Sequence, residues 1–232
     1  MRREAGMHYL VLAALFVGAL VTCNLVATKF VEVNMGFRKF TLSAGILAYP
    51  VTFLITDVLS EIYGKRRTQN VVWAGFAATV FTLAILALGG HYSATENSQV
   101  SDDMYNAVFK NSPRLIAASM IAYLSAQLVD VRVFHFWKRV TKGKMLWVRN
   151  NFSTIFSQLI DTTLVVSVIF INIENGKPVS TIGWASYGQL ILDGWIFKVM
   201  WAALDTPIFY GLSYWYKRRF KLENGGNLKV EL

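Results

Sequence analysis

Six long apolar stretches divide the sequence, and they restrict the chain to a narrow choice of folds. A hydrocarbon core about 30 Å thick needs roughly 20 helical residues at about 1.5 Å each. Only 16% of the 232 residues are charged and 54% are hydrophobic, so little chain remains for a soluble domain. We predict an all-α membrane protein, a bundle of six transmembrane helices in a single integral-membrane domain over residues 1–232. The expected spans are residues 7–27, 42–59, 71–88, 115–129, 155–173 and 190–214.

This composition excludes several classes of function. Short loops leave no room for a large soluble catalytic domain, and the G-x-x-x-x-G-K-[ST] phosphate loop of ATPases is absent from the sequence. A single cysteine, Cys23, permits no disulfide framework, and no Cys/His cluster has the spacing of metal ligands. We therefore expect neither a metal nor a cofactor.

The distribution of basic residues predicts the orientation. When the loops are assigned to alternate sides, sixteen Lys and Arg residues fall on one side and six on the other. Because cytoplasmic loops carry the excess of positive charge, we predict that both termini are cytoplasmic, in the cell inner membrane. The net charge of +9 is then explained by orientation, and nucleic acid is not expected as a partner.

Two local patterns predict further detail. Ser101 and two aspartates precede residues 104–109, which is typical of a capped short helix on the outer face. Ala14 and Gly18 form a small-x-x-x-small pair that suits close helix contact.

Polar residues inside the second span lie on one helix face. Tyr49, Phe53, Asp57 and Glu61 recur at four-residue steps, so two aromatic rings precede two carboxylates. An Asp near a helix centre costs about 2.5–3.5 kcal/mol on insertion scales, so such residues should face the bundle interior. Pro50 should free a backbone carbonyl within this span. We expect Glu61 to pair with the basic run at residues 64–67, and the sequence leaves open whether Asp57 is structural or functional.

The fourth span repeats this spacing with Tyr123, Gln127 and Asp130. The neighbouring Arg132 makes an interfacial ion pair the expected role of Asp130. The buried amide of Gln127 needs partners from another helix or from a ligand.

The fifth and sixth spans carry the strongest indications of a site. Asp161 lies near the middle of its span, with Gln158 about one turn before it. Lys198 lies too far from either surface for its ammonium group to reach water fully, so it needs a counter-ion or must lose its proton. A Lys198–Asp161 ion pair is the structural interpretation, and Asp205 lies two turns further along the face of Lys198.

Carboxylates outnumber cations among these buried residues. Asp57, Asp161 and Asp205 share only Lys198, so they require water, protons or a ligand that donates hydrogen bonds. A carboxylate opposite the N–H edge of a planar base, with an aromatic ring above it, suits a purine-like or pteridine-like solute.

The ordered set of these residues resembles the queuosine-precursor transporters, also called the vitamin-uptake-transporter family. The resemblance extends from the first to the sixth span. It rests on Asn24, Tyr49-Pro50-x-x-Phe53-x-x-Thr56-Asp57, Tyr63-Gly64, Arg114, Ser119-x-x-x-Tyr123-x-x-x-Gln127-x-x-Asp130, Ser157-x-x-x-Asp161-Thr162, Lys198 and Thr206-Pro207-x-x-Tyr210.

The resemblance implies import of 7-deazaguanine compounds for tRNA-queuosine salvage. It also implies an architecture similar to the substrate-binding subunits of energy-coupling-factor vitamin importers. The cyano and aminomethyl precursors and queuine all present a guanine-like edge that a carboxylate such as Asp161 or Asp57 can accept. Amides would meet the carbonyl and ring nitrogens, and Phe53 or Tyr123 would stack. The candidate substrate-binding residues are Asn24, Tyr49, Phe53, Asp57, Tyr123, Gln127, Gln158, Asp161, Lys198 and Asp205.

Two other classes of membrane protein also carry polar residues inside their spans. An intramembrane enzyme is not expected, because His8, His91 and His135 all lie outside the span centres and no Gly-x-Gly-Asp sequence is present. A substrate-binding subunit for a vitamin or nucleobase that needs a separate energising partner stays open, as does a homo-oligomer.

Overall fold

The computed structural model describes residues 2–26, 29–34, 36, 39–109, 113–142, 144–174, 177–222, 226 and 228. Within them the chain is mostly helical, with two short hairpins. The elements in chain order are α1 (Arg2–Leu25), β1 (Phe30–Asn34), β2 (Lys39–Ser43), the 3₁₀ helix η1 (Ala44–Leu47), α2 (Tyr49–Ile62), α3 (Lys65–Gly89), α4 (Asp102–Phe109), α5 (Pro113–Val140), α6 (Leu146–Phe170), β3 (Ile171–Glu174), β4 (Lys177–Ser180) and α7 (Trp184–Phe220).

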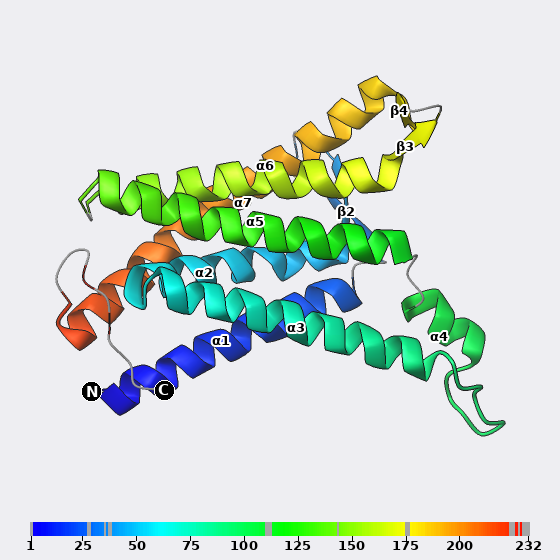
Figure 1. Ribbon diagram of the computed structural model, residues 1–232, viewed down its shortest axis with the longest axis horizontal. Helices are drawn as coiled ribbons and strands as arrows, with labels where there is room; N and C mark the ends of the chain where they lie inside the picture. The colour runs from blue at the N-terminus through cyan, green and yellow to red at the C-terminus, as the bar shows by residue number, and fades with distance from the viewer. Residues whose placement is uncertain are drawn as a thin grey trace.

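The long helices α1, α2, α3, α5, α6 and α7 run alternately up and down one bundle (Figure 1). The short helix α2 is central, since it packs against α1, α3, α5 and α7. Helix α5 packs along α6, and α6 packs along α7. The beginning of α1 and the end of α7 lie at the same end of the bundle (Figure 1).

The surface of the bundle is apolar and its interior is rich in polar groups. Trp73 and Phe81 on α3 are 51% and 67% exposed, whereas Glu61 and Arg149 are fully buried. Soluble proteins almost never bury charged residues completely unless they are paired. This distribution is that of a bundle whose outer face meets lipid and whose inner faces meet each other.

Among the described residues, three helical segments are long and apolar enough to cross a membrane: Arg3–Leu25, Ala44–Ile62 and Lys65–Gly89. Helices α5, α6 and α7 have 28, 25 and 37 residues, so their length also suffices at about 1.5 Å per residue. The predicted helical bundle is confirmed. The number of spans and their orientation stay predictions.

The prediction of an all-α chain is wrong in two connections, which form antiparallel hairpins. Strand β1 pairs with β2, and β3 pairs with β4. Residues 42–43, expected in the second span, belong to β2, and residues 171–173, expected in the fifth, belong to β3. Both β1 and β3 alternate β-branched with polar residues, a pattern that favours strands over helix.

Pro50 lies at the start of helix α2, which begins at Tyr49 just after η1 ends at Leu47. The backbone N–H that proline lacks would have no partner inside α2 at this position, and its fixed φ suits the start of a helix. The carbonyl four residues earlier belongs to Ile46 in η1, so the expected freed carbonyl lies before α2 and stays a prediction.

The predicted short helix is confirmed. Helix α4 spans Asp102–Phe109, and the Ser101 hydroxyl accepts a hydrogen bond from the Met104 N–H at 3.3 Å. The Tyr105 hydroxyl donates to the Leu86 carbonyl at 3.0 Å, which ties α4 to the end of α3.

Close helix packing occurs at Gly75 rather than at the predicted Ala14–Gly18 pair. A Cβ atom at Gly75 would lie 2.7 Å from Phe16 Cε1 and 3.2 Å from Tyr123 Oη, whereas one at Gly18 would meet no atom within 4 Å. Gly75 of α3 thus sets the approach of α3 to α1 and α5.

We predict that Gly75→Ala lowers the thermal stability of the purified protein, whereas the matched Gly18→Ala does not. The added methyl group must displace the buried Phe16 ring, and overpacking of this kind costs about 1–3 kcal/mol. Thermal unfolding in detergent checks this expectation. Equal melting temperatures for the two variants would contradict it.

Candidate functional site

Three side chains from α2, α6 and α7 meet in what we call the Asp161 cluster. The Tyr49 hydroxyl donates a hydrogen bond to Asp161 Oδ2 at 2.6 Å, and Lys198 Nζ lies 2.5 Å from the same oxygen. The ammonium group also lies 4.7 Å from the centroid of the Tyr49 ring, within the range of a cation–π interaction. The predicted Lys198–Asp161 ion pair is therefore confirmed.

The Asp161 cluster forms part of the wall of a cavity of about 190 Å³, which we call the main cavity. An apolar cavity of about 150 Å³ is large enough to bind benzene, so a single ring system fits a space of this size. The wall combines aromatic, charged and apolar groups. It consists of Leu20, Cys23, Asn24, Gly45, Ile46, Tyr49, Tyr123, Asp161, Val165 and Lys198.

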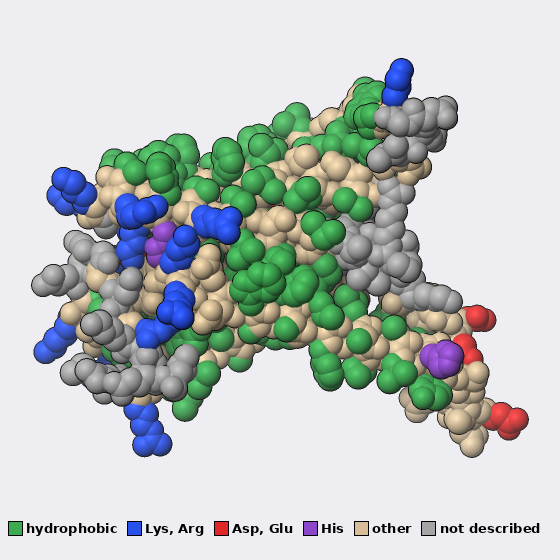
Figure 2. All heavy atoms as spheres, viewed as in Figure 1, with side chains coloured by type: hydrophobic (Ala, Val, Ile, Leu, Met, Phe, Trp, Pro, Cys, Tyr) green, Lys and Arg blue, Asp and Glu red, His purple; other side chains and the backbone are tan. Residues whose placement is uncertain are grey.

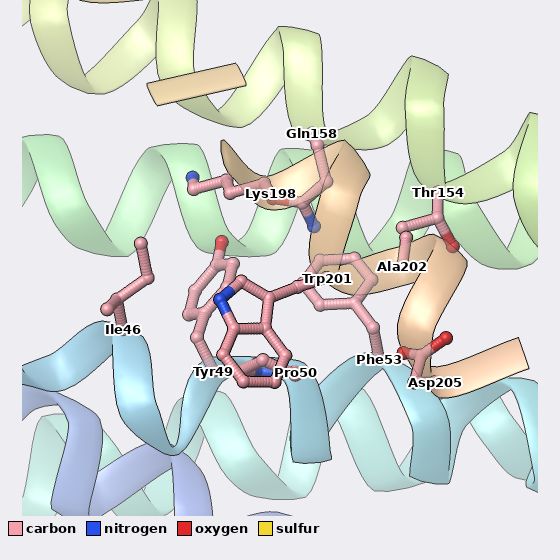
Figure 3. A pocket seen from close by; sticks show the side chains of 10 residues that line it. All are labelled: Ile46, Tyr49, Pro50, Phe53, Thr154, Gln158, Lys198, Trp201, Ala202 and Asp205. Carbon is pink, nitrogen blue, oxygen red and sulfur yellow. The ribbon is translucent and has the colours of Figure 1, made fainter. Parts of the chain in front are cut away.

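A smaller hollow of about 20 Å³, which we call the side pocket, is lined by the residues drawn in Figure 3. It shares Ile46, Tyr49 and Lys198 with the main cavity. Figure 3 shows that Phe53 comes from α2, Gln158 from α6 and Asp205 from α7. The rings of Tyr49 and Phe53 lie 5.3 Å apart between centroids and give this region an aromatic side.

Three carboxylates form a second group, the carboxylate cluster, which adjoins the side pocket through Asp205. Asp57 of α2 and Asp130 of α5 lie within hydrogen-bonding range of each other, and Asp205 of α7 lies close enough to act on both electrostatically. Asp57 is 2% exposed and Asp130 is 1% exposed. Ser157 donates a hydrogen bond to Asp130 Oδ1 at 3.1 Å.

The predicted ion pair between Asp130 and Arg132 is wrong. Asp130 turns inward to Asp57 and Ser157, whereas Arg132 is exposed. Residues two apart on a helix do not share a face, so burial of the first directs the second away from the interior.

Several buried polar groups have no hydrogen-bond partner among the described residues. Neither amide atom of the fully buried Gln127 is bonded, and Gln158 Oε1 and Tyr123 Oη are also unpaired. Buried polar groups are nearly always satisfied by protein, water or ligand. These three residues are therefore among those that a bound solute or water would satisfy.

The ten predicted site residues divide among these places. Five of them line the main cavity, and Phe53, Gln158 and Asp205 line only the side pocket. Asp57 belongs to the carboxylate cluster, and Gln127 lines neither hollow. The five in the main cavity are Asn24, Tyr49, Tyr123, Asp161 and Lys198. The side chains of Arg114 and Ser119 lie outside the part of the chain that the structure describes.

Glu61 lies at the centre of an ion-pair network that joins four helices. Arg149 of α6 donates to both carboxylate oxygens at 2.8 and 3.3 Å. Lys217 of α7 lies 2.6 Å from Oε1, and Lys138 of α5 lies 3.3 Å from Oε2. The predicted pairing of Glu61 with the basic run at residues 64–67 is wrong, because Lys65 and Arg66 at the start of α3 are exposed.

The charge pattern of the sequence did not predict that Arg149, Lys138 and Lys217 lie in the interior. The fifth span was expected to begin at residue 155, so Arg149 counted as a loop charge, but α6 begins at Leu146. The signal was nevertheless present, because Arg149, Ser153, Ser157 and Asp161 follow at four-residue steps on one helix face.

We predict that Glu61→Gln destabilises the protein strongly. Removing one partner of a buried ion pair costs about 3–5 kcal/mol, and here three cations would lose their carboxylate. Thermal unfolding in detergent measures the loss. The matched control is Glu4→Gln, which removes the exposed ion pair with Arg219 and should change the melting temperature little. Similar melting temperatures for the two variants would show that the Glu61 network does not stabilise the fold.

A search against family models matches residues 43–212 to a family described as "Putative vitamin uptake transporter". The matched segment contains every residue of the Asp161 cluster and the carboxylate cluster. No solved structure matches the chain.

Three curated relatives are similar to the chain. A "Probable queuosine precursor transporter" of Bacillus subtilis is 34% identical over 67% of this chain and 66% of its own length. A protein of the same name from Haemophilus influenzae is 29% identical over 62% of this chain and 57% of its own length. The "Queuosine precursor transporter" of Escherichia coli is 24% identical over 60% of each chain. The chain thus spans about three-fifths to two-thirds of the relatives that it matches.

Proposed function

The chain belongs to the vitamin uptake transporter family, and from this premise we propose that it imports 7-deazaguanine precursors of queuosine across the cell inner membrane. The resemblance noted in the sequence is thereby confirmed at the level of the family, which is one of transporters and not of enzymes. The solute would be the cyano or aminomethyl deazaguanine, or queuine.

The observation that carries this proposal is the main cavity with Asp161 in its wall. A space of about 190 Å³ between helices accommodates a flat heterocycle, and Tyr49 offers a ring beside the carboxylate. An aromatic side chain stacks on the flat face of any nucleobase. A carboxylate accepts hydrogen bonds from the adjacent N1–H and 2-amino groups of a guanine-like edge. In this arrangement Asn24 and Tyr123 would contact the remaining polar atoms of the solute.

The distribution of charge supports six spans with both termini cytoplasmic. Figure 2 shows Lys and Arg side chains gathered at the end where α1 begins and α7 ends, while the acidic side chains visible on this face lie beside α4 at the other end. Positive charge marks the cytoplasmic side of a membrane protein. The main cavity, near the start of α2 and the end of α1, would then open toward the outside.

We expect Asp161→Asn to abolish uptake of labelled deazaguanine while the protein still folds and inserts. The amide presents an N–H group to a solute edge that also donates, and it loses the charge that strengthens the hydrogen bonds. Uptake by cells that make no deazaguanine, together with the amount of protein in the membrane, checks this outcome. Asp103→Asn on the exposed α4 is the control, and undiminished uptake by Asp161→Asn would remove Asp161 from the site.

A panel of free bases should distinguish how much the hydrogen-bond donors of the solute contribute to binding and how much its ring contributes. A bound solute stabilises the purified protein by about 2.7 kcal/mol at 100 times its dissociation constant. A deazaguanine that lacks the 2-amino group loses a hydrogen bond to a charged acceptor, worth about 1.5–3 kcal/mol, and should bind roughly 10 to 150 times more weakly. Thermal shifts across a concentration series measure this ratio. Equal affinities for the two bases would show that Asp161 does not bind the 2-amino edge.

A further inference from the structure

We propose that Asp57 and Asp130 together bind a proton whose movement energises solute import. This inference rests on the proposed function, because it names the energy source for the same transport. The geometry that supports it lies outside the main cavity, in the carboxylate cluster.

The two carboxyl groups lie close enough for a hydrogen bond, which can form only when one of them carries a proton. Asp57 and Asp130 come from α2 and α5 and are almost fully buried. Two carboxylates in contact cannot both be ionised at an acceptable cost when they are shielded from water. The pair therefore holds a proton in this conformation.

The charged groups around the pair do not neutralise it. Asp205 of α7 adds a third carboxylate. Among the described residues of α6, the neutral Ser153 and Ser157 contact Asp130 and the neutral Asn150 contacts Asp205. The neighbouring interior cations are engaged elsewhere. Lys198 binds Asp161, while Lys138, Arg149 and Lys217 bind Glu61.

Gln127 gives an independent indication that a polar ligand reaches this level of the bundle. It lies one turn before Asp130 on the same buried face of α5, and neither of its amide atoms has a partner. An unpaired buried amide costs free energy unless water or a solute satisfies it. Water beside Gln127 would also carry protons to and from the pair.

The same helices connect the proton pair to the solute. Helix α2 carries Tyr49 and Asp57, and α7 carries Lys198 and Asp205. Asp205 lines the side pocket together with Tyr49 and Lys198. A movement of α2 against α7 therefore changes the main cavity and the carboxylate cluster together. The proton enters from the outside, is held between the two carboxyls, and leaves to the cytoplasm in the conformation that releases the solute.

No group of three or more Asp, Glu, His or Cys residues in the described part of the chain is arranged to hold a metal ion. The carboxyl groups of Asp57 and Asp130 lie close together, and their negative charge favours binding of a proton. A sodium ion is the competing occupant, and the experiment below distinguishes it.

The test uses the full chain in proteoliposomes with a pH-sensitive dye in the lumen and the membrane potential held at zero. With the outside one pH unit more acidic, one proton per neutral solute supports up to about tenfold accumulation of labelled deazaguanine. Adding the base without a pH gradient should acidify the lumen, and replacing sodium by choline should change nothing.

Asp57→Asn and Asp130→Asn should each lose gradient-driven accumulation and lumen acidification. Asp130→Asn should keep exchange of internal for external base, because Asp130 lines neither the main cavity nor the side pocket. Exchange also proves that Asp130→Asn is folded. Asp103→Asn on α4 serves as the control and should behave as the natural chain.

The outcomes separate the two proposals. Three results would overturn the proton pair and leave the proposed function standing. They are uptake that does not depend on the pH gradient, uptake that requires sodium, and uptake that stays proton-coupled in both variants. Absence of any base uptake by the natural chain overturns the proposed function and the proton pair together.

Discussion

Every ionisable side chain inside this bundle must either pair with an opposite charge or be neutral, because its apolar surroundings do not solvate a charge. That requirement orders the interior into levels. Lys198 meets Asp161 beside the main cavity, Glu61 meets three cations near the other end, and the carboxylate cluster lies between them. The carboxylate cluster alone lacks a cation among the contacts described, and it is where the chemistry calls for a mobile charge.

Helix α2 organises these levels although it is the shortest of the long helices. Its single face of Tyr49, Phe53, Asp57 and Glu61 passes from the main cavity to the Glu61 network in three helical steps. Tyr49 contacts α6, and Glu61 contacts α5, α6 and α7, so α2 is the common partner of these three helices. A chain with the same composition but a shifted α2 face would lose the Asp161 cluster, the carboxylate cluster and the Glu61 network at once.

Much of this arrangement could be predicted from the sequence, and the failures share one cause. Four-residue spacing identified the polar face of α2, and the depth of Lys198 identified Asp161 as its partner. Spacing does not tell which helix lies opposite, so Glu61 and Asp130 were assigned to cations nearby in sequence. Hydropathy also ended the spans at charged residues, which hid Arg149 in the first turns of α6. Hairpins β1–β2 and β3–β4 depend on pairing across a turn, which the apolar runs obscured.

The Glu61 network has a mechanical consequence for the end of the bundle that it occupies. Its three cations arise from α5, α6 and α7 and converge on one carboxylate of α2. No helix of the four can separate from that carboxylate without exposing charge to a medium that does not solvate it. This end of the molecule therefore opens as a whole or stays shut, and partial leaks between individual helices are disfavoured.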